Sequence, residues 1–280
     1  MKNIVVLYHK DCPDGFGAAW AAWKKFGDKA DYVAIEYKNP PPPELKNKEI
    51  YLVDFGYNQK ELMKKLLVCN KRMVMIDHHI SRKNILPILP EYSFDVNHSG
   101  AVLAWRYFHP NKAVPKLLLY VEDEDLWRFK LPLARELTLA IQSYDYNFTF
   151  WNKMAADFEN PSKRKKYAEE GRAILKLINK TIEILVAEGD EVIFEKNKAL
   201  AVNSPVFASE IGEYIVRKKG YPIGIIWHKD GNGIRFQLRS SKRVDVSKLA
   251  QKYGGGGHKR AAGFYLKKTI KLPWKIIKNA

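Results

Sequence analysis

The stretch IVVLYHKDCPDGFGAAWAAW, residues 4–23, decides the fold because it joins two elements through a polar loop. Its first part, residues 4–8, is an uninterrupted apolar run of strand length. Its last part opens a segment rich in Ala and Trp that extends from Gly15 to Phe26 and stops at Gly27, as a helix does. An apolar run without alternation is typical of a strand buried on both faces, which indicates a parallel sheet covered by helices.

The same pattern continues over the next hundred residues. Further strands are predicted at residues 32–37, 50–53 and 73–76, and further helices at residues 58–68, 99–108 and 115–125. Asn58 is the expected N-cap of the helix at 58–68, with Glu61 three residues later in the position of a capping box. Strands and helices that alternate in this way predict an α/β domain.

The second half of the chain has a different composition. Residues 160–189 are highly charged and carry Ile and Leu at helical spacing, which predicts a long connecting helix. Beyond it, strands at residues 199–202, 222–227 and 233–240 and a helix at 245–253 predict a smaller α/β unit. We therefore expect a parallel-sheet domain at residues 1–155, a helical linker at 156–192 and a smaller α/β C-terminal domain at 193–280.

Composition limits the environment and the partners. The chain has 280 residues, 46% of them hydrophobic, and lacks both a run of ~20 apolar residues and the features of a signal peptide. With only two cysteines, it has no disulfide framework, so we expect a cytoplasmic protein that does not contact membranes. The net charge of +17 favours polyanionic partners, although lysines spread over solvated surfaces would give the same number.

Polar clusters follow three of the predicted strands. They are His9, Asp11 and Asp14 after the first strand, Asp54 after the third, and Asp77, His78 and His79 after the fourth. Ligands bind at the carboxyl ends of strands in an open parallel sheet, so we expect these side chains to converge. Nitrogen and oxygen donors suit Mn²⁺ or a similar ion, and so many carboxylates favour two cations with one carboxylate between them.

Each of these residues also has a structural interpretation when it is taken alone. Asp11 and Asp14 could serve as turn or N-cap residues, and His9 could be a hydrogen-bonded histidine at a strand end. The glycines at 254–257 could simply end a helix. The alternative is that their amides cradle an anion, with His258, Lys259 and Arg260 supplying positive charge. The coincidence of three clusters favours the functional interpretation.

These motifs resemble a known family. YHKDCPDGFGAA, VDFG and IDHH are similar to the first three motifs of the DHH phosphoesterase superfamily, in particular its nanoRNase and oligoribonuclease-like members. LRSS and VDVSKLAQKYGGGGHKRAAGF resemble the glycine-rich core of the DHH-associated C-terminal domain. The resemblance covers nearly the whole chain and is least diagnostic between residues 130 and 200.

The resemblance implies a role for each motif residue. One metal would be held by His9, Asp11 and Asp54, and a second by Asp14, Asp54, His78 and an aspartate of VEDEDLWRF, where we prefer Asp123 to Asp125. Asp54 would bridge the metals, His79 would contact the scissile phosphate, and Asp77 would orient the histidines. The substrate would be bound by Arg239, Ser240, Gly255, Gly256, Gly257, His258, Lys259 and Arg260. Cys12 and Pro13 separate Asp11 from Asp14, which departs from the usual spacing; we expect Cys12 to be a spectator, with a soft metal ligand as the alternative.

The expected function is therefore two-metal hydrolysis of phosphodiesters. The implied enzyme is a 3′–5′ exonuclease or phosphodiesterase that cleaves short single-stranded oligonucleotides or linear dinucleotides. Its cofactors would be two divalent ions, with Mn²⁺ preferred over Mg²⁺ or Co²⁺. A phosphoanhydride hydrolase and a nucleotide-binding module without catalysis are the competing hypotheses, and a homodimer is left open.

Overall fold

The computed structural model describes residues 1–36, 39–267 and 272–277, and these divide into two compact units, Met1–Leu175 and Lys176–Ala280. Tyr37, the last residue of the second predicted strand, lies outside the described residues. The boundary between the units falls inside one long helix, α7 (Pro161–Ala187), which occupies the segment predicted to be helical. The predicted domain limits at residues 155 and 192 stay a prediction.

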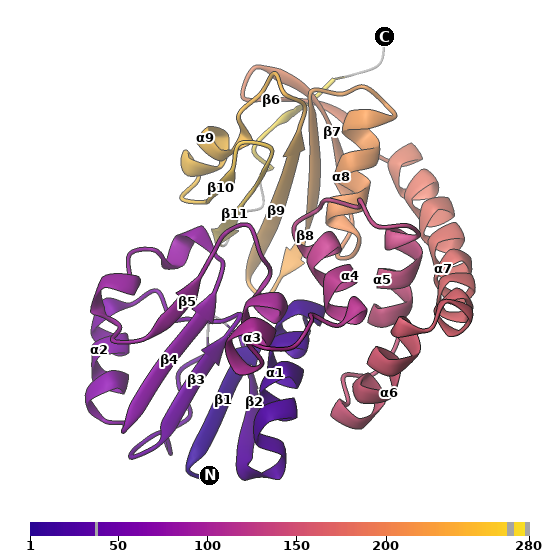
Figure 1. Ribbon diagram of the computed structural model, residues 1–280. Helices are drawn as coiled ribbons and strands as arrows, with labels where there is room; N and C mark the ends of the chain where they lie inside the picture. Colours follow the sequence, from indigo (N-terminus) through magenta and orange to yellow (C-terminus); the bar gives the residue numbers. More distant parts are fainter. Residues whose placement is uncertain (37–38, 268–271, 278–280) are drawn as a thin grey trace. The chain divides into compact units, whose positions relative to one another are not determined.

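A five-stranded parallel sheet organises the first unit, in the order β2-β1-β3-β4-β5 (Figure 1). The strands are β1 (Ile4–His9), β2 (Ala30–Ile35), β3 (Glu49–Val53), β4 (Arg72–Asp77) and β5 (Tyr92–Phe94). β1, β3 and β4 are therefore neighbours, and their carboxyl ends meet at one edge. The predicted parallel sheet is confirmed, and β5 is an edge strand that the sequence did not reveal.

Alternating residues of the strands pack against two different layers. Val6, Val53 and Ile76 belong to a core with α1 (Pro13–Phe26) and α3 (Gly100–Phe108). Their neighbours Leu7 and Met75 belong to a second core with α2 (Lys60–Val68). The sheet is thus covered on both faces, as its continuous apolar runs predict (Figure 1).

Further helices pack against the first of these cores. They are α4 (Lys116–Asp125), α5 (Ala134–Gln142) and α6 (Phe148–Glu159). The predicted capping box at the start of α2 is wrong. The N-cap of α2 is Gln59 and makes no side-chain capping bond, because Asn58 turns aside and its Oδ1 accepts a hydrogen bond from Arg82.

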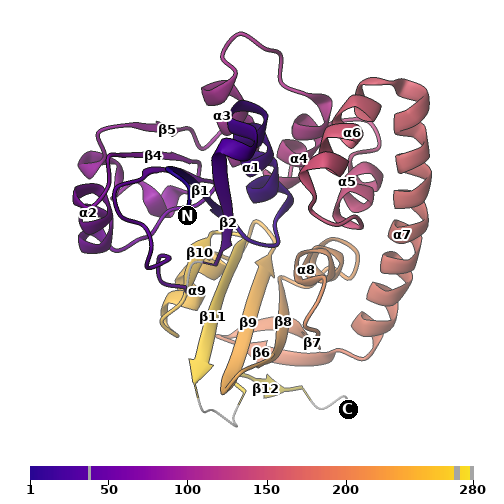
Figure 2. The same cartoon turned by 90° about the horizontal axis from the view of Figure 1, so that it is seen from below.

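The second unit is built on a seven-stranded sheet, in the order β10-β11-β9-β8-β7-β6-β12 (Figure 2). Its strands are β6 (Asp190–Phe194), β7 (Asn197–Asn203), β8 (Ile223–Asp230), β9 (Gly233–Ser240), β10 (Gly256–His258), β11 (Ala261–Lys267) and β12 (Lys275–Ile276). Only the β7–β8 pair is parallel among the pairs of these described strands. α9 (Val246–Gln251) packs against β10 and β11, and α8 (Ala208–Arg217) packs against β8 and β9.

Within the described ranges, no helix combines the length and the apolar composition needed to cross a bilayer.

Candidate metal centre

Side chains from three strand ends meet beside the first sheet. His9 is the last residue of β1, Asp54 follows β3 directly, and His78 follows β4. His9 Nδ1 lies 3.6 Å from Asp54 Oδ2, and His78 Nε2 lies 3.3 Å from Asp54 Oδ1. Asp54 therefore lies between His9 and His78 and is the central member of the group.

The backbone holds Asp54 in a strained conformation. Its φ is +51°, which is uncommon for a residue with a side chain. Its amide donates a hydrogen bond to the carbonyl of Ile76 on β4, at 2.8 Å. A Cβ added to Gly100 would lie 2.5 Å from the Asp54 Cβ, so only glycine fits at the start of α3. The strain and the close packing together fix the buried carboxylate at the end of β3.

Asp14 enters the group from the first turn of α1. Its two oxygens accept hydrogen bonds from the amides of Gly100, at 2.7 Å, and Ala101, at 2.9 Å, at the N-terminus of α3. The free amides and the dipole of a helix N-terminus favour a carboxylate there. Asp14 is 1% exposed, and His78 Nε2 lies 3.6 Å from its Oδ2.

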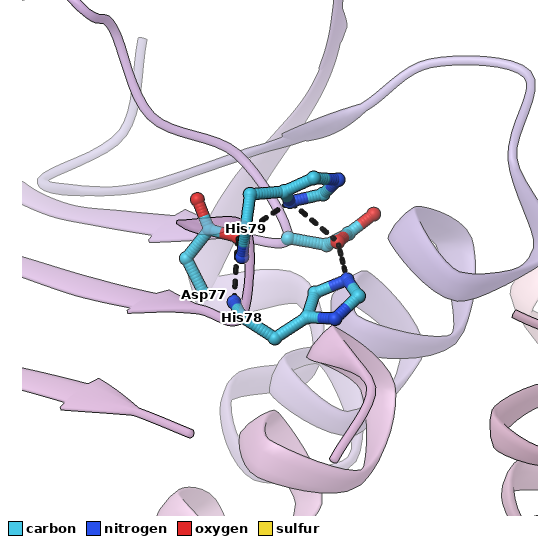
Figure 3. Close-up of side chains that lie close together, drawn as sticks. Asp77, His78 and His79 are labelled. Atoms are coloured by element: carbon cyan, nitrogen blue, oxygen red, sulfur yellow. Dashed lines mark hydrogen bonds and ion pairs between the residues drawn. The ribbon is translucent and has the colours of Figure 1, made fainter. Parts of the chain in front are cut away.

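Asp77 orients the two histidines that follow it (Figure 3). Its Oδ1 accepts hydrogen bonds from the backbone amides of His78, at 2.7 Å, and His79, at 3.1 Å. The same oxygen lies 2.7 Å from His79 Nδ1, which fixes that imidazole. Arg82 Nε lies 4.0 Å from the other oxygen of Asp77 and places a buried cation behind it. Nothing in the sequence indicates that Arg82 lies close to Asp77.

The structure places Asp125, and not Asp123, beside these residues. Asp125 Oδ2 lies 3.5 Å from His78 Nε2, and Asp125 groups with Asp14 and His78 as potential ligands of one ion. The carboxylate of Asp123 accepts hydrogen bonds from the amides of Lys130, at 3.0 Å, and Leu131, at 2.9 Å. It stabilises the loop after α4, and the preference for Asp123 is thereby corrected in favour of the alternative.

Asp11 also differs from its expected place. Its φ is +53°, its side chain is 77% exposed, and its carboxylate lies 3.6 Å from Lys10 Nζ. The sulfur of Cys12, expected to be a spectator, lies in a group with His9 and Asp54 in which all ligand atoms are within 4.8 Å of one another. The extra residue in the first motif turns Asp11 outward and Cys12 inward, a detail that spacing alone did not resolve.

The electrostatics of the group fit bound cations. Burial, together with the charges of Asp54 and Asp125, raises the pKa of Asp14 well above its usual value. Burial and the charge of Asp54 likewise raise the pKa of Asp125 to about 6. Burial also acts to raise the pKa of Asp54, but the facing His78 and His9 outweigh it and lower that pKa. Asp14 and Asp54 are each 1% exposed, and the side chain of Asp125 is 23% exposed. Three carboxylates that lie so close together repel one another, and a divalent ion relieves this repulsion.

Buried polar atoms without a hydrogen-bond partner support the same conclusion. Among the described residues, Asp54 Oδ1, His78 Nε2 and Asp125 Oδ2 are such atoms. Buried polar atoms are rarely left unpaired, and imidazole nitrogen and carboxylate oxygen are the donors that Mn²⁺, Co²⁺ and related ions accept. The residues present thus fit divalent metal ions.

The second unit carries a groove of about 610 Å³ along β9, β11 and the glycine run. It is lined by Arg235, Phe236, Gln237, Arg239, Gly254, Gly255, Gly256, Gly257, Ala261, Ala262, Gly263, Phe264 and Tyr265. A Cβ on Gly255 would meet the carbonyl oxygen of Gly263 at 2.1 Å, which explains why that position needs glycine. Arg239 Nη2 donates to Ser209 Oγ at 2.6 Å, and burial lowers the Arg239 pKa.

The groove contains half of the predicted substrate-binding residues. Arg239, Gly255, Gly256 and Gly257 line it, as expected. Ser240 does not line it, because its hydroxyl donates to the carbonyl of Val244 at 2.7 Å and fixes the start of the loop before α9. The exposed side chains of His258, at the end of β10, and of Lys259 and Arg260, in the turn that leads to β11, lie outside the lining.

Comparisons with known proteins identify a known domain in the second unit and a relative that matches most of the chain. The DHHA1 domain matches residues 199–275. The uncharacterized protein R106 of Acanthamoeba polyphaga mimivirus is 29% identical over 288 residues; the match covers 92% of this chain, which spans 66% of the length of that relative.

Solved structures share the fold at low sequence identity. A DHH domain of a protein described as a member of the s1p family has a TM-score of 0.62 at 14% identity, covering 94% of this chain and 82% of that one. The pGpG-specific phosphodiesterase PggH of Vibrio cholerae has a TM-score of 0.51 at 15% identity, covering 95% and 94%. RecJ of Thermus thermophilus in complex with Mn²⁺ has a TM-score of 0.52 at 14% identity, covering 95% and 50%.

Proposed function

We propose that this chain is a phosphoesterase of the DHH superfamily, and that it is a two-metal phosphodiesterase that hydrolyses short oligonucleotides or linear dinucleotides to mononucleotides; the match of residues 199–275 to the DHHA1 domain and the fold shared with DHH proteins support this. PggH, which shares the fold, is described as specific for the linear dinucleotide pGpG. RecJ, another protein of this fold, is described as an exonuclease and binds Mn²⁺. These descriptions support a nucleotide substrate and divalent metal cofactors, and we further propose 3′–5′ exonuclease action and a preference for Mn²⁺ over Mg²⁺ or Co²⁺.

The observation that carries the proposal is the shared position of Asp54. This one buried carboxylate belongs to a ligand group with His9 and lies 3.3 Å from His78, which groups with Asp14 and Asp125. We assign His9 and Asp54 to one ion and Asp14, Asp54, His78 and Asp125 to the other. When bound, two such ions supply an activated water and neutralise the charge of the phosphate under attack.

The remaining residues of the group position the substrate. His79 is held at Nδ1 by Asp77, so its Nε2 edge is the one directed away from that carboxylate. Burial acts to lower the His79 pKa, but the hydrogen bond and charge of Asp77 outweigh it and raise the pKa to about 8. An imidazole held in this way donates a hydrogen bond to a phosphate oxygen. We therefore assign His79 to the scissile phosphate and Asp77 to the support of His79.

The groove of the second unit supplies the binding of the nucleotide. Glycine amides allow close approach of an anion, and the guanidinium of Arg239 matches the geometry of a phosphate. Phe236, Phe264 and Tyr265 in the lining offer apolar surface beside it. A groove of about 610 Å³ is in the range of small-ligand pockets, which supports a mono- or dinucleotide portion of the substrate.

A panel of substrates tests the proposal. Hydrolysis is measured with Mn²⁺ on di- to pentanucleotide RNAs, a long single-stranded RNA, linear dinucleotides, cyclic nucleotides, pyrophosphate and polyphosphate. Each assay is repeated with Asp54→Ala and with the exposed Asp28→Ala as a matched control. We expect rapid cleavage of the shortest oligonucleotides and linear dinucleotides by the wild type and Asp28→Ala, and none by Asp54→Ala.

Two outcomes of this panel contradict the proposal. Cleavage of pyrophosphate or polyphosphate alone assigns the protein to the phosphoanhydride hydrolases. Tight binding of nucleotides without cleavage of any substrate makes it a binding module.

A further inference from the structure

We propose that Cys12 is a metal ligand, and that the ion held by His9 and Asp54 is therefore bound through sulfur as well as nitrogen and oxygen. The inference deepens the proposed function and rests on it. It concerns the identity of one ligand and limits the preference for Mn²⁺ to the second ion, because a thiolate at the first ion selects a borderline-soft ion such as Zn²⁺, Fe²⁺ or Co²⁺.

Geometry provides the first argument. A ring nitrogen of His9, the sulfur of Cys12 and a carboxylate oxygen of Asp54 all lie within 4.8 Å of one another. Ligand atoms around one tetrahedral zinc ion, at bond lengths of roughly 2.0 to 2.3 Å, stand about 3.5 Å apart, so small side-chain movements bring the three onto a common ion. Asp54 is 1% exposed, and its Oδ2 lies 3.6 Å from His9 Nδ1, so a buried carboxylate oxygen is available beside that imidazole.

The position of the Asp11 side chain provides the second argument. Its carboxylate is turned to the surface beside Lys10, and it belongs to none of the ligand groups found among the described residues. Without Asp11, the ligand groups among the described residues leave His9 and Asp54 for the first ion, apart from Cys12. Cys12 is the residue that supplies a third ligand, and three protein ligands with one open position is the usual arrangement of a catalytic zinc site.

The backbone holds Cys12 in position. It is the N-cap residue of α1, with φ of −130° and ψ of 130°, and Pro13 follows at the first helical position. The Phe16 amide donates to the carbonyl of Cys12 at 2.9 Å, which anchors the residue at the first turn. Cys12 is in no disulfide, and the other cysteine, Cys69, lies at the C-terminus of α2 outside the ligand groups of the described chain.

Co²⁺ provides a direct test, because a thiolate bound to Co²⁺ gives a sulfur-to-metal charge-transfer band in the near ultraviolet. The full-length protein is stripped of metal and titrated with Co²⁺ alone, as wild type, Cys12→Ser and Cys69→Ser. Cys69→Ser is the matched control because it removes the second thiol and leaves the ligand groups intact. We expect the band in the wild type and in Cys69→Ser, and its complete loss in Cys12→Ser.

Affinity provides a second readout. We expect Cys12→Ser to bind the tighter of two Zn²⁺ ions about tenfold or more weakly, whereas Cys12→Asp, which restores a charged oxygen ligand, retains Mn²⁺ binding. Circular dichroism of each variant shows whether it is folded. In the wild-type protein, Zn²⁺ should protect Cys12 from an alkylating reagent, which tests the same contact without a substitution. A band that persists in Cys12→Ser, or Co²⁺ binding by the wild type without a band, overturns the inference.

The hydrolysis assay separates this inference from the proposed function. A cobalt band without cleavage of any substrate supports the Cys12 ligand and contradicts the phosphodiesterase. Cleavage of dinucleotides without a band, and with unchanged metal affinity in Cys12→Ser, supports the phosphodiesterase and contradicts the ligand.

Discussion

Asp77 and His79 are joined by a 2.7 Å contact between Oδ1 and Nδ1, and the same oxygen also accepts both neighbouring backbone amides. We expect Asp77→Asn to lower kcat by about 10- to 100-fold, because the imidazole of His79 is no longer held in one orientation. The metal content should stay nearly unchanged, because Asp77 and His79 are not among the proposed metal ligands. Turnover and bound metal are measured on the same sample. A kcat equal to that of the wild type would show that Asp77 serves the fold alone.

Asp11 and Asp14 share a motif but differ in exposure. Asp11→Asn should change activity by no more than about twofold, since substitutions of exposed residues are usually worth less than about 0.5 kcal/mol. Asp14→Asn should lower activity by more than about 100-fold and reduce the bound metal, because a buried carboxylate of the ligand group is lost. Metal analysis and initial rates check both. An inactive Asp11→Asn would return Asp11 to the metal centre.

Asp123 and Asp125 lie in the same turn of α4 and have different partners. Asp123→Ala should lower the free energy of unfolding by about 1 to 3 kcal/mol, because the amides of Lys130 and Leu131 lose a charged acceptor. Asp125→Ala should weaken metal binding with little loss of stability, since its Oδ2 has no hydrogen bond to lose within the described structure. Denaturant unfolding of the metal-free protein and metal titration distinguish them. The reverse pattern would restore Asp123 as the ligand.

Arg239 belongs to the groove and not to the ligand groups. Arg239→Ala should raise KM by about 10- to 100-fold, which corresponds to the roughly 1.5 to 3 kcal/mol of a hydrogen bond to a charged group, while kcat changes little. Arg217→Ala is the matched control, because Arg217 is an exposed arginine that pairs with Glu213 on α8. Equal loss of kcat and of kcat/KM would mean that Arg239 acts in the transition state.

The sequence predicts the first unit well because its signals are local. Unbroken apolar strands identify buried parallel strands, and a polar residue directly after each strand marks the edge where ligands bind. Asp54 and His78 could be selected on this ground alone. The sequence did not predict β5, because this edge strand has only three residues, Tyr92–Phe94, too few to show a hydrophobic pattern.

The errors at the site arise where two candidates stand close together in sequence. Periodicity indicates which side chains of α4 are buried, and Asp123 is buried as expected. Its carboxylate, however, contacts the amides of the following loop and not the other candidate ligands. In the first motif, Asp11 has a positive φ, and Cys12 lies beside His9 and Asp54 in the place expected for Asp11. Both outcomes depend on the path of the backbone in space, which the spacing of residues does not specify.

Every proposed ligand, from His9 to Asp125, precedes Arg235, the first residue of the glycine-rich groove. Domains generally fold as units during synthesis, beginning from the N-terminus. A nascent chain therefore carries every proposed metal ligand while the residues of the groove are still untranslated, so the proposed metal centre can form before the groove exists.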